Sequence, residues 1–212
     1  MATVADPKRT AFEADASPGK APRTARGRET LRRLLDAAAL EFGERGFHEA
    51  SISGITRRAG TALGSFYTYF DSKDAIFSAL VRHMSQSVAL AAAAGVSPGS
   101  AGIRREREAF SAFLEFAREH KEIYRIIDEA EFVDPTSYRA HYEVTASRIA
   151  ARFAESVAVG AMTPGDNEIR AWAVMGMNVF LGLRFGVWAE DRSIDEVVTA
   201  SEALLRDGLG AG

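Results

Sequence analysis

Residues 51–70 read SISGITRRAGTALGSFYTYF, and this stretch decides how the rest of the chain is interpreted. Ser51 is a candidate N-cap for a short helix through Arg58. Gly60 marks a tight turn, and a second short helix follows over about residues 62–69. Two short helices joined by a glycine-containing turn form a helix-turn-helix, whose second helix enters the major groove of DNA. The stretch therefore predicts a DNA-binding motif.

The motif separates into two sets of side chains. The apolar set can pack inward: Ile52, Ile55, Ala59, Phe66 and Phe70. The second set is left for the outer side: Thr61, Ala62, Leu63, Gly64, Ser65, Tyr67, Thr68 and Tyr69. The small residues at 64 and 65 allow close approach to bases, and the tyrosine hydroxyls can reach phosphates together with Lys73.

Charge is distributed unevenly along the chain, whose formal net charge is −3. Residues 20–73 hold ten Lys/Arg and six Asp/Glu, a net +4, whereas residues 74–212 hold fourteen and twenty, a net −6. A basic segment joined to an acidic body is typical of a protein whose one end meets phosphates.

Four separated elements resemble the N-terminal domain of TetR-type repressors: FGERGF at 42–47, ITRRAG at 55–60, GSFYTYF at 64–70, and Ser72-Lys73. Their order and spacing match over about residues 28–80. The resemblance implies a homodimer on a near-palindromic operator. It places Ser51, Ser53 and Lys73 on the DNA backbone, Ala62 to Ser65 with Tyr67 in the groove, and Tyr69 on a phosphate.

Three positions depart from the usual pattern of that family. Thr56 stands where alanine is typical, and Leu63, where a polar residue is frequent, suggests contact with a thymine methyl group. Gly54 stands where an acidic residue is common, and we expect it to cost its helix roughly 0.5–1 kcal/mol relative to alanine.

The remaining sequence predicts an all-α fold of about nine helices. Residues 1–26 lack the apolar core of a secretion signal and are predicted to form an unstructured basic tail, which could reach DNA. A helix over 28–45, closed by Gly46, opens a three-helix DNA-binding domain over 27–73. Residues 74–212 are predicted to form a helical ligand-binding and dimerisation domain, with helices over about 72–94, 102–119, 121–131, 135–159 and 166–189 and a last one from Ser193.

The resemblance implies that this C-terminal body senses a small molecule, whose binding releases DNA. Aromatic and apolar candidates for the pocket favour an apolar or amphipathic effector: Phe110, Phe113, Tyr124, Ile127, Tyr138, Tyr142, Trp172, Met175 and Phe180. The alternative for each is ordinary core packing.

The segment AWAVMGMNVFLGLRFGVW at 171–188 is apolar nearly all round. Its length and Gly182-x-x-x-Gly186 spacing are compatible with a membrane span, but Asn178 and Arg184 within it favour burial against a partner subunit. By the resemblance, the dimer interface involves 172–188 and 194–205, and no membrane partner is expected.

The sequence offers little for catalysis. There is no cysteine, and the four histidines lack the spacing of a metal site. No phosphate-binding loop or nucleophile elbow is present, so we predict neither catalytic residues nor a metal or cofactor, and a cytoplasmic location. Two alternatives remain: a regulator of this fold that activates or lacks an inducer, and an all-helical enzyme or carrier using the aromatic pocket.

Overall fold

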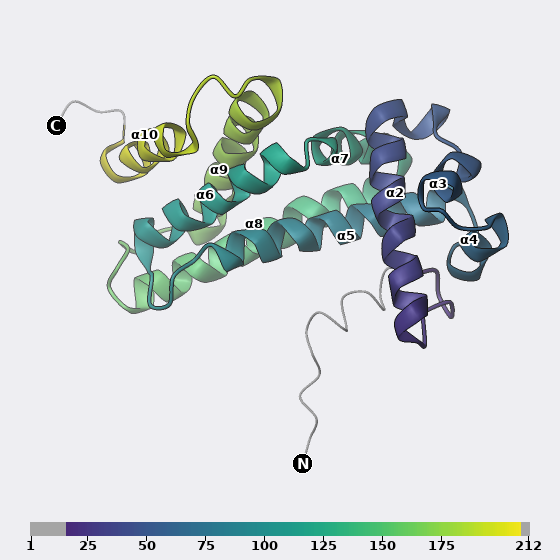
Figure 1. Cartoon of the computed structure of the whole chain (residues 1–212). Coiled ribbons are helices and arrows are strands. Elements are labelled where there is room, and N and C mark those ends of the chain that lie inside the picture. Colours follow the sequence, from purple (N-terminus) through teal and green to yellow (C-terminus); the bar gives the residue numbers. More distant parts are fainter. Residues whose placement is uncertain (1–15, 209–212) are drawn as a thin grey trace, which may run out of the picture. The chain divides into compact units, whose positions relative to one another are not determined.

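The computed structural model describes residues 16–208, and in this part of the chain all regular structure is helical (Figure 1). Nine α-helices and one π-helix are present there, which confirms the predicted all-α fold. The chain forms two compact units. Of the described residues, unit 1 contains those up to Gln86 together with Glu122–His141, and unit 2 contains Ser87–Lys121 together with those from Tyr142 onward.

Unit 1 is built around α2 (Ala25–Glu49), which begins at the N-cap Thr24. The apolar spacing of its sequence buries one face completely, including Leu31, Leu34, Leu35 and Phe42. The predicted end of the first helical stretch at Gly46 is confirmed, because Gly46 is non-helical with a φ of 78°; a further three helical residues beyond this kink, which the sequence did not predict, complete α2. Glycine is required there because other residues rarely adopt that conformation.

Three helices follow α2 in the order predicted from the motif. They are α3 (Ile52–Arg58), α4 (Leu63–Tyr69) and α5 (Lys73–Ala94), whose first part belongs to unit 1. Phe77 of α5 packs edge-on against the rings of Phe42 and Phe47, with centroids 5.1 and 5.0 Å away. These aromatic contacts join α2 to α5, the two long helices of unit 1.

Helix α7 (Glu122–Val133) also belongs to unit 1, although we expected its residues in the C-terminal domain. It packs on α2, and Arg125 Nη1 donates to the carbonyl groups of Gly43 and Glu44, both at 3.1 Å. Glu129 accepts the backbone N–H of Phe47 at 2.6 Å. These contacts hold both sides of the kink in α2, and they join segments too distant in sequence for a local pattern to predict.

Unit 2 contains α6 (Gly102–Glu119), most of α8 (Pro135–Ala158), α9 (Asn167–Gly182) and α10 (Ile194–Asp207). One apolar cluster joins α8 to α9, and a second joins α6 to α10. An ion pair also connects α6 to α8, because Arg152 donates to both oxygens of the buried Glu106 carboxylate at 2.9 and 2.7 Å. The predicted capping box at the start of α10, Ser193 with Glu196, is present.

The helix predicted over 166–189 changes geometry near its end. After Gly182 it continues as a π-helix, η1 (Leu183–Trp188). Arg118 Nη2 donates to the carbonyl groups of Phe185 and Arg192 at 3.1 and 2.7 Å. These bonds from α6 hold carbonyl groups of the wider turn and of the residues just after it.

The outer face of α9 and η1 is apolar and exposed. Ile169, Phe180 and Trp188 are 69%, 71% and 70% exposed, and Trp172 is 44% exposed. Among the described residues, Asn167–Trp188 is the segment long and apolar enough to cross a membrane, with a mean hydropathy of 1.2. In the single chain these apolar side chains remain exposed to solvent.

Candidate nucleic-acid interface

Helix α4 stands on an aromatic base. Phe66 and Phe70 are fully buried, and their ring centroids lie 5.6 Å apart. The turn before α4 is closed by Gly60, with φ of 60°, and by a bond from Thr61 N to the carbonyl of Thr56 at 3.0 Å. This base fixes which face of the short helix points outward.

The outward face contains most of the residues assigned to it from the sequence. The exposed positions are Ala62, Leu63, Gly64, Tyr67 and Thr68, with Ser65 half-buried. Leu63 and Tyr67 are 51% and 47% exposed, so both side chains are available for contact on this face. A Cβ atom added at Gly64 would meet no heavy atom within 4 Å, so the surface there is open.

Two residues of the motif lie elsewhere than we expected. Tyr69 is only 8% exposed and packs inward. Thr61 is half-buried, and its hydroxyl oxygen is inaccessible to solvent. For Tyr69 the reason is the helical period, since residue 69 follows Phe66 by three positions and therefore shares its inner face. Thr61 lies in the turn before α4, where its backbone N–H donates to the carbonyl of Thr56.

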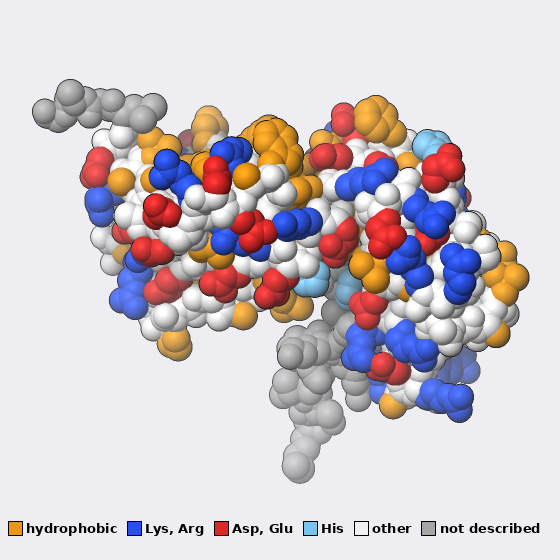
Figure 2. Space-filling model, turned by 45° about the horizontal axis from the view of Figure 1, so that its top comes forward, with side chains coloured by type: hydrophobic (Ala, Val, Ile, Leu, Met, Phe, Trp, Pro, Cys, Tyr) orange, Lys and Arg blue, Asp and Glu red, His pale blue; other side chains and the backbone are white. Residues whose placement is uncertain are grey.

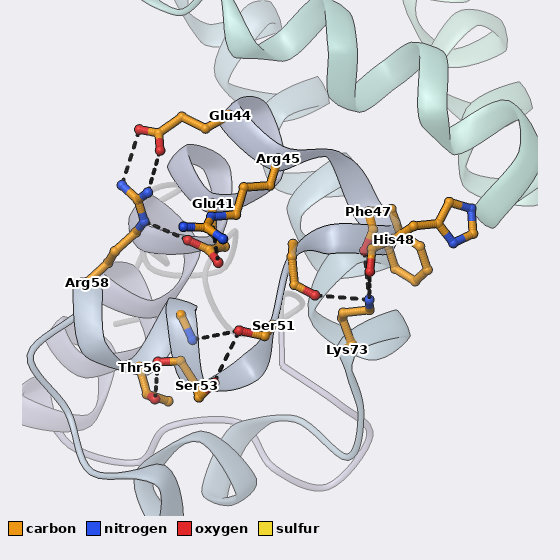
Figure 3. Close-up of polar contacts among 12 residues, drawn as sticks. Glu41, Glu44, Arg45, Phe47, His48, Ser51, Ser53, Thr56, Arg58 and Lys73 are labelled. Atoms are coloured by element: carbon orange, nitrogen blue, oxygen red, sulfur yellow. Dashed lines mark hydrogen bonds and ion pairs between the residues drawn. The ribbon is translucent and has the colours of Figure 1, made fainter.

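Lys73 also has a different environment from the one predicted. Its ammonium group donates to the carbonyl groups of Phe47, His48 and Ala50 at 2.7, 3.2 and 3.0 Å (Figure 3). It also lies 4.5 Å from the centre of the Phe47 ring. A lysine has three N–H donors, and all three are used here. Lys73 therefore closes the end of α2 in this structure instead of offering free donors to phosphate.

Ser51 and Ser53 mark the beginning of α3. Ser51 is the predicted N-cap and accepts the N–H of Gly54 at 3.0 Å, and the two serine hydroxyl groups lie 3.1 Å apart (Figure 3). Both side chains are exposed. They combine a structural role at the cap with access to solvent on the same surface.

An ion pair between a buried carboxylate and a solvent-accessible arginine, which sequence reasoning missed, fixes α3 against α2. Glu41 of α2 is 1% exposed and accepts a bond from Arg58 Nε at 2.7 Å (Figure 3). Arg58 also pairs with Glu44. The carboxylate fits over Gly54, where an added Cβ atom would lie 2.0 Å from Oε1. The sequence did contain a signal for this ion pair: an acidic residue, Glu41, falls on the buried face of α2, and a glycine, Gly54, stands in α3.

The residues predicted to line an effector pocket are divided between the units. Tyr124, Ile127 and Tyr138 belong to unit 1. In unit 2, Tyr142 and Met175 meet in the cluster of α8 and α9, and Phe110 and Phe113 meet in the cluster of α6 and α10. Trp172 and Phe180 are exposed on α9, which favours the other role predicted for that segment, a subunit contact. No group of three or more His, Asp or Glu residues suited to a metal ion occurs in the described part of the chain.

Comparison with known proteins agrees with this geometry. Residues 34–80 match the family described as "Bacterial regulatory proteins, tetR family". The chain is 54% identical over 56 residues to the HTH-type transcriptional regulator YdgC of Bacillus subtilis, a match covering 26% of this chain and 29% of that one. The chain thus spans under a third of that relative's length.

Longer matches are weaker in sequence. The HTH-type transcriptional activator FasR of Mycolicibacterium smegmatis is 26% identical over 153 residues, which cover 66% of this chain and 70% of that protein. The structure of the transcriptional regulator FadR from Bacillus subtilis in complex with stearoyl-CoA has a TM-score of 0.74 at 15% identity, covering 84% of this chain and 99% of the other. This last likeness concerns the fold alone. On its helix-turn-helix and these matches, the N-terminal part of the chain, residues 34–80, is a DNA-binding domain of the TetR family.

Proposed function

We propose that the protein is a ligand-responsive transcriptional regulator that binds a near-palindromic DNA operator as a homodimer. The observation that carries this proposal is the exposed face of α4, with open surface at Gly64 and an exposed ring at Tyr67, held on a buried aromatic base. A helix supported in this way can enter a major groove without losing its own packing.

Within the proposed complex, the start of α4 reads bases. Ala62, Leu63, Gly64 and Ser65 approach the base edges, and Tyr67 lies beside them. Leu63 supplies an apolar contact of the kind made with a thymine methyl group. Ser51 and Ser53 contact the DNA backbone from the start of α3. Roles for Tyr69 and Lys73 on DNA would require these side chains to leave their contacts within the chain, and a role for Thr61 would require its hydroxyl to become accessible.

We assign DNA binding to α2, α3 and α4, and effector binding and dimerisation to the helices that follow. The apolar face of α9 and η1 supports the second assignment, because a partner subunit would remove its exposed rings from water. Two-fold symmetry of the dimer would then place two copies of α4 on two half-sites. The proposed regulator acts in the cytoplasm, where its operator lies.

The proposed effector is apolar or amphipathic. The aromatic and aliphatic composition of the helices after α5 supports this chemistry, and the FadR protein with the same fold was solved with stearoyl-CoA. Stearoyl-CoA is therefore the first probe to use. We propose repression released by the effector; the alternative is activation, because the relative FasR is named an activator.

The test is selection of duplex DNA from a random pool by the purified full-length dimer, followed by titration with stearoyl-CoA. We expect an enriched sequence with two-fold symmetry, and release of that duplex when the acyl-CoA binds. Enrichment of no sequence by a folded dimer at low salt would overturn the proposed function. Binding of DNA without release by stearoyl-CoA, or by any member of an acyl-CoA and fatty acid series, would favour the regulator without an inducer of this class.

A further inference from the structure

The residues just before α2 contact the end of α4, although we expected a tail without structure there; residues 1–15 of that tail lie outside the described part. Ser17 N donates to the carbonyl of Tyr69 at 3.0 Å, and Lys20 Nζ donates to the carbonyl of Tyr67 at 2.9 Å. Lys20 also pairs with Asp71 at 2.5 Å. Residues 16–24, which we call the N-terminal clasp, thus join the start of α2 to the end of α4.

The clasp is a folded element in its own right. Ala16 and Ser17 are 8% and 9% exposed, and Lys20 N donates back to the carbonyl of Ser17 at 2.9 Å. Gly19 makes this turn possible with its left-handed φ of 78°. The next element begins immediately, because Thr24 caps α2.

The clasp stabilises the C-terminal end of α4. A helix of seven residues is too short to be stable alone, and its last carbonyl groups have no partners within the helix. A lysine at that end binds one such carbonyl and interacts favourably with the negative end of the helix dipole. Lys20 also neutralises Asp71, whose carboxylate would otherwise repel phosphates beside the helix.

The clasp and the first turn of α2 differ from the rest of unit 1 in how their cationic side chains are paired. Between residues 20 and 73, most cationic side chains are bound to partners within the unit: Lys20, Arg32, Arg33, Arg45, Arg58 and Lys73. Among the described residues, no side-chain partner is found for Arg23, Arg26, Arg28 or Arg57, and Arg23, Arg26 and Arg57 are exposed. Lys and Arg side chains are prominent on the surface of unit 1 (Figure 2). Three of the four free arginines therefore lie within six residues, at the clasp and the first turn of α2.

We propose that the clasp and the first turn of α2 form a second DNA contact: the clasp holds the end of α4, and Arg23 of the clasp, with Arg26 and Arg28 of α2, contacts the phosphates that flank the bases read by α4. This inference rests on the proposed function and adds the electrostatic part of the interface, which Lys73 does not supply in this structure. Lys20 is a positioning residue, and the three arginines are the contact residues. Phosphate contacts fix the protein on DNA but carry no sequence information, so their loss has a recognisable signature.

The experiment measures the salt dependence of binding to the selected duplex. Each phosphate contact contributes about 0.9 to the slope of log K against log salt concentration. We expect the double variant Arg23→Ala/Arg26→Ala to reduce the slope by roughly 0.9 for each arginine in each subunit, with the preferred base sequence unchanged. Arg148→Ala, which removes an exposed arginine of unit 2, is the matched control and should leave the slope unchanged.

A thermodynamic cycle tests the positioning role of Lys20. We expect Lys20→Met to weaken binding in the wild-type background and to have much less effect when Arg23 and Arg26 are already absent. Lys20→Arg, which keeps the charge and can reach the same carbonyl, should restore most of the affinity. Melting temperatures of all variants show whether each one is folded.

Two results would overturn the inference while leaving the proposed function intact. One is a slope in the double arginine variant equal to that of Arg148→Ala. The other is an effect of Lys20→Met that is the same in both backgrounds. Failure of the wild-type dimer to bind any selected duplex would instead overturn the proposed function, and the role of the clasp with it.

Discussion

Gly54 in α3 lies directly beneath the carboxylate of Glu41. A methyl group at this position would lie 2.0 Å from Oε1 and 2.6 Å from Cδ of Glu41, and Arg58 holds that carboxylate in place. Alanine favours a helix over glycine by about 0.5–1 kcal/mol, but overpacking a buried site costs about 1–3 kcal/mol. We therefore expect Gly54→Ala to lower the free energy of unfolding, measured by urea denaturation, although the sequence alone indicated the opposite sign.

Gly64→Ala is the matched control for this prediction. It makes the same change in another short helix, at a position where the new methyl group meets no heavy atom within 4 Å. We expect its free energy of unfolding to stay the same or to rise by up to about 1 kcal/mol. Equal stabilisation of both variants would show that the Glu41 carboxylate moves aside readily, contrary to the packing described here.

Tyr67 and Tyr69 have opposite environments, being 47% and 8% exposed. We expect Tyr67→Ala to weaken DNA binding with a smaller loss of stability than Tyr69→Ala, because its ring is half exposed and makes one edge-on contact with the ring of Phe66, with centroids 5.3 Å apart. Tyr69→Ala should cost roughly 3 kcal/mol of stability, as loss of a buried ring does. Calorimetry with a DNA-binding titration of each variant checks both, and a similar loss of stability in the two would contradict the assignment of Tyr67 to the outer face.

At the scale of elements, the sequence predicted helix ends and turns correctly where neighbouring residues determine them. The cap at Ser51, the capping box at Ser193 and the turn at Gly60 are all present as predicted. The sequence did not predict local structure that depends on contacts with residues far away in the chain. The helix α2 resumes after Gly46 while Arg125 and Glu129 of α7 hold the backbone on both sides, and nothing near Gly46 in the sequence indicates these partners.

Asp134 caps the start of α8 as predicted, since its carboxylate accepts the N–H of Ser137 at 3.1 Å. Burial raises the pKa of Asp134, but hydrogen bonds from Ser137 and Ser78 outweigh burial and lower it below its usual value. A lowered pKa means that the ionised carboxylate stabilises the fold above pH 4 or so, and that this stabilisation is lost as the pH falls through the folded pKa.

We therefore expect Asp134→Ala to lower the free energy of unfolding by about 1 kcal/mol at neutral pH, the usual worth of an N-cap. The difference from the wild type should shrink when denaturation curves are recorded below about pH 4. Asp134→Asn, which keeps a capping oxygen without the charge, should lose less stability at neutral pH. A difference that stays constant over this pH range would show that the carboxylate charge contributes nothing.

At the scale of the whole molecule, the spacing of apolar residues predicted which face of each helix is buried, but not which other element, ligand or subunit buries it. The nine pocket candidates have the same kind of spacing, yet Ile127 and Met175 are core residues of different units, and Phe180 is on the surface. Helical spacing reports that one face of a helix avoids water. Whether that face meets its own core, an effector or a second subunit depends on tertiary and quaternary contacts that a single sequence does not contain.

The exposed face of α9 permits a direct test of the proposed dimer. Burying one large apolar side chain contributes about 1.5–3 kcal/mol, and each 1.4 kcal/mol changes a dissociation constant tenfold. Replacing Trp172 and Phe180 together by glutamate should therefore raise the dimer dissociation constant at least about 100-fold, as measured by sedimentation equilibrium. Phe132→Glu is the control, because Phe132 is 83% exposed on α7 in unit 1 and outside this face.

A two-fold symmetric operator should then lose affinity for the double variant and not for Phe132→Glu, because one subunit contacts only one half-site. A double variant that remains dimeric would show that the subunits meet elsewhere and that the apolar face of α9 serves another contact.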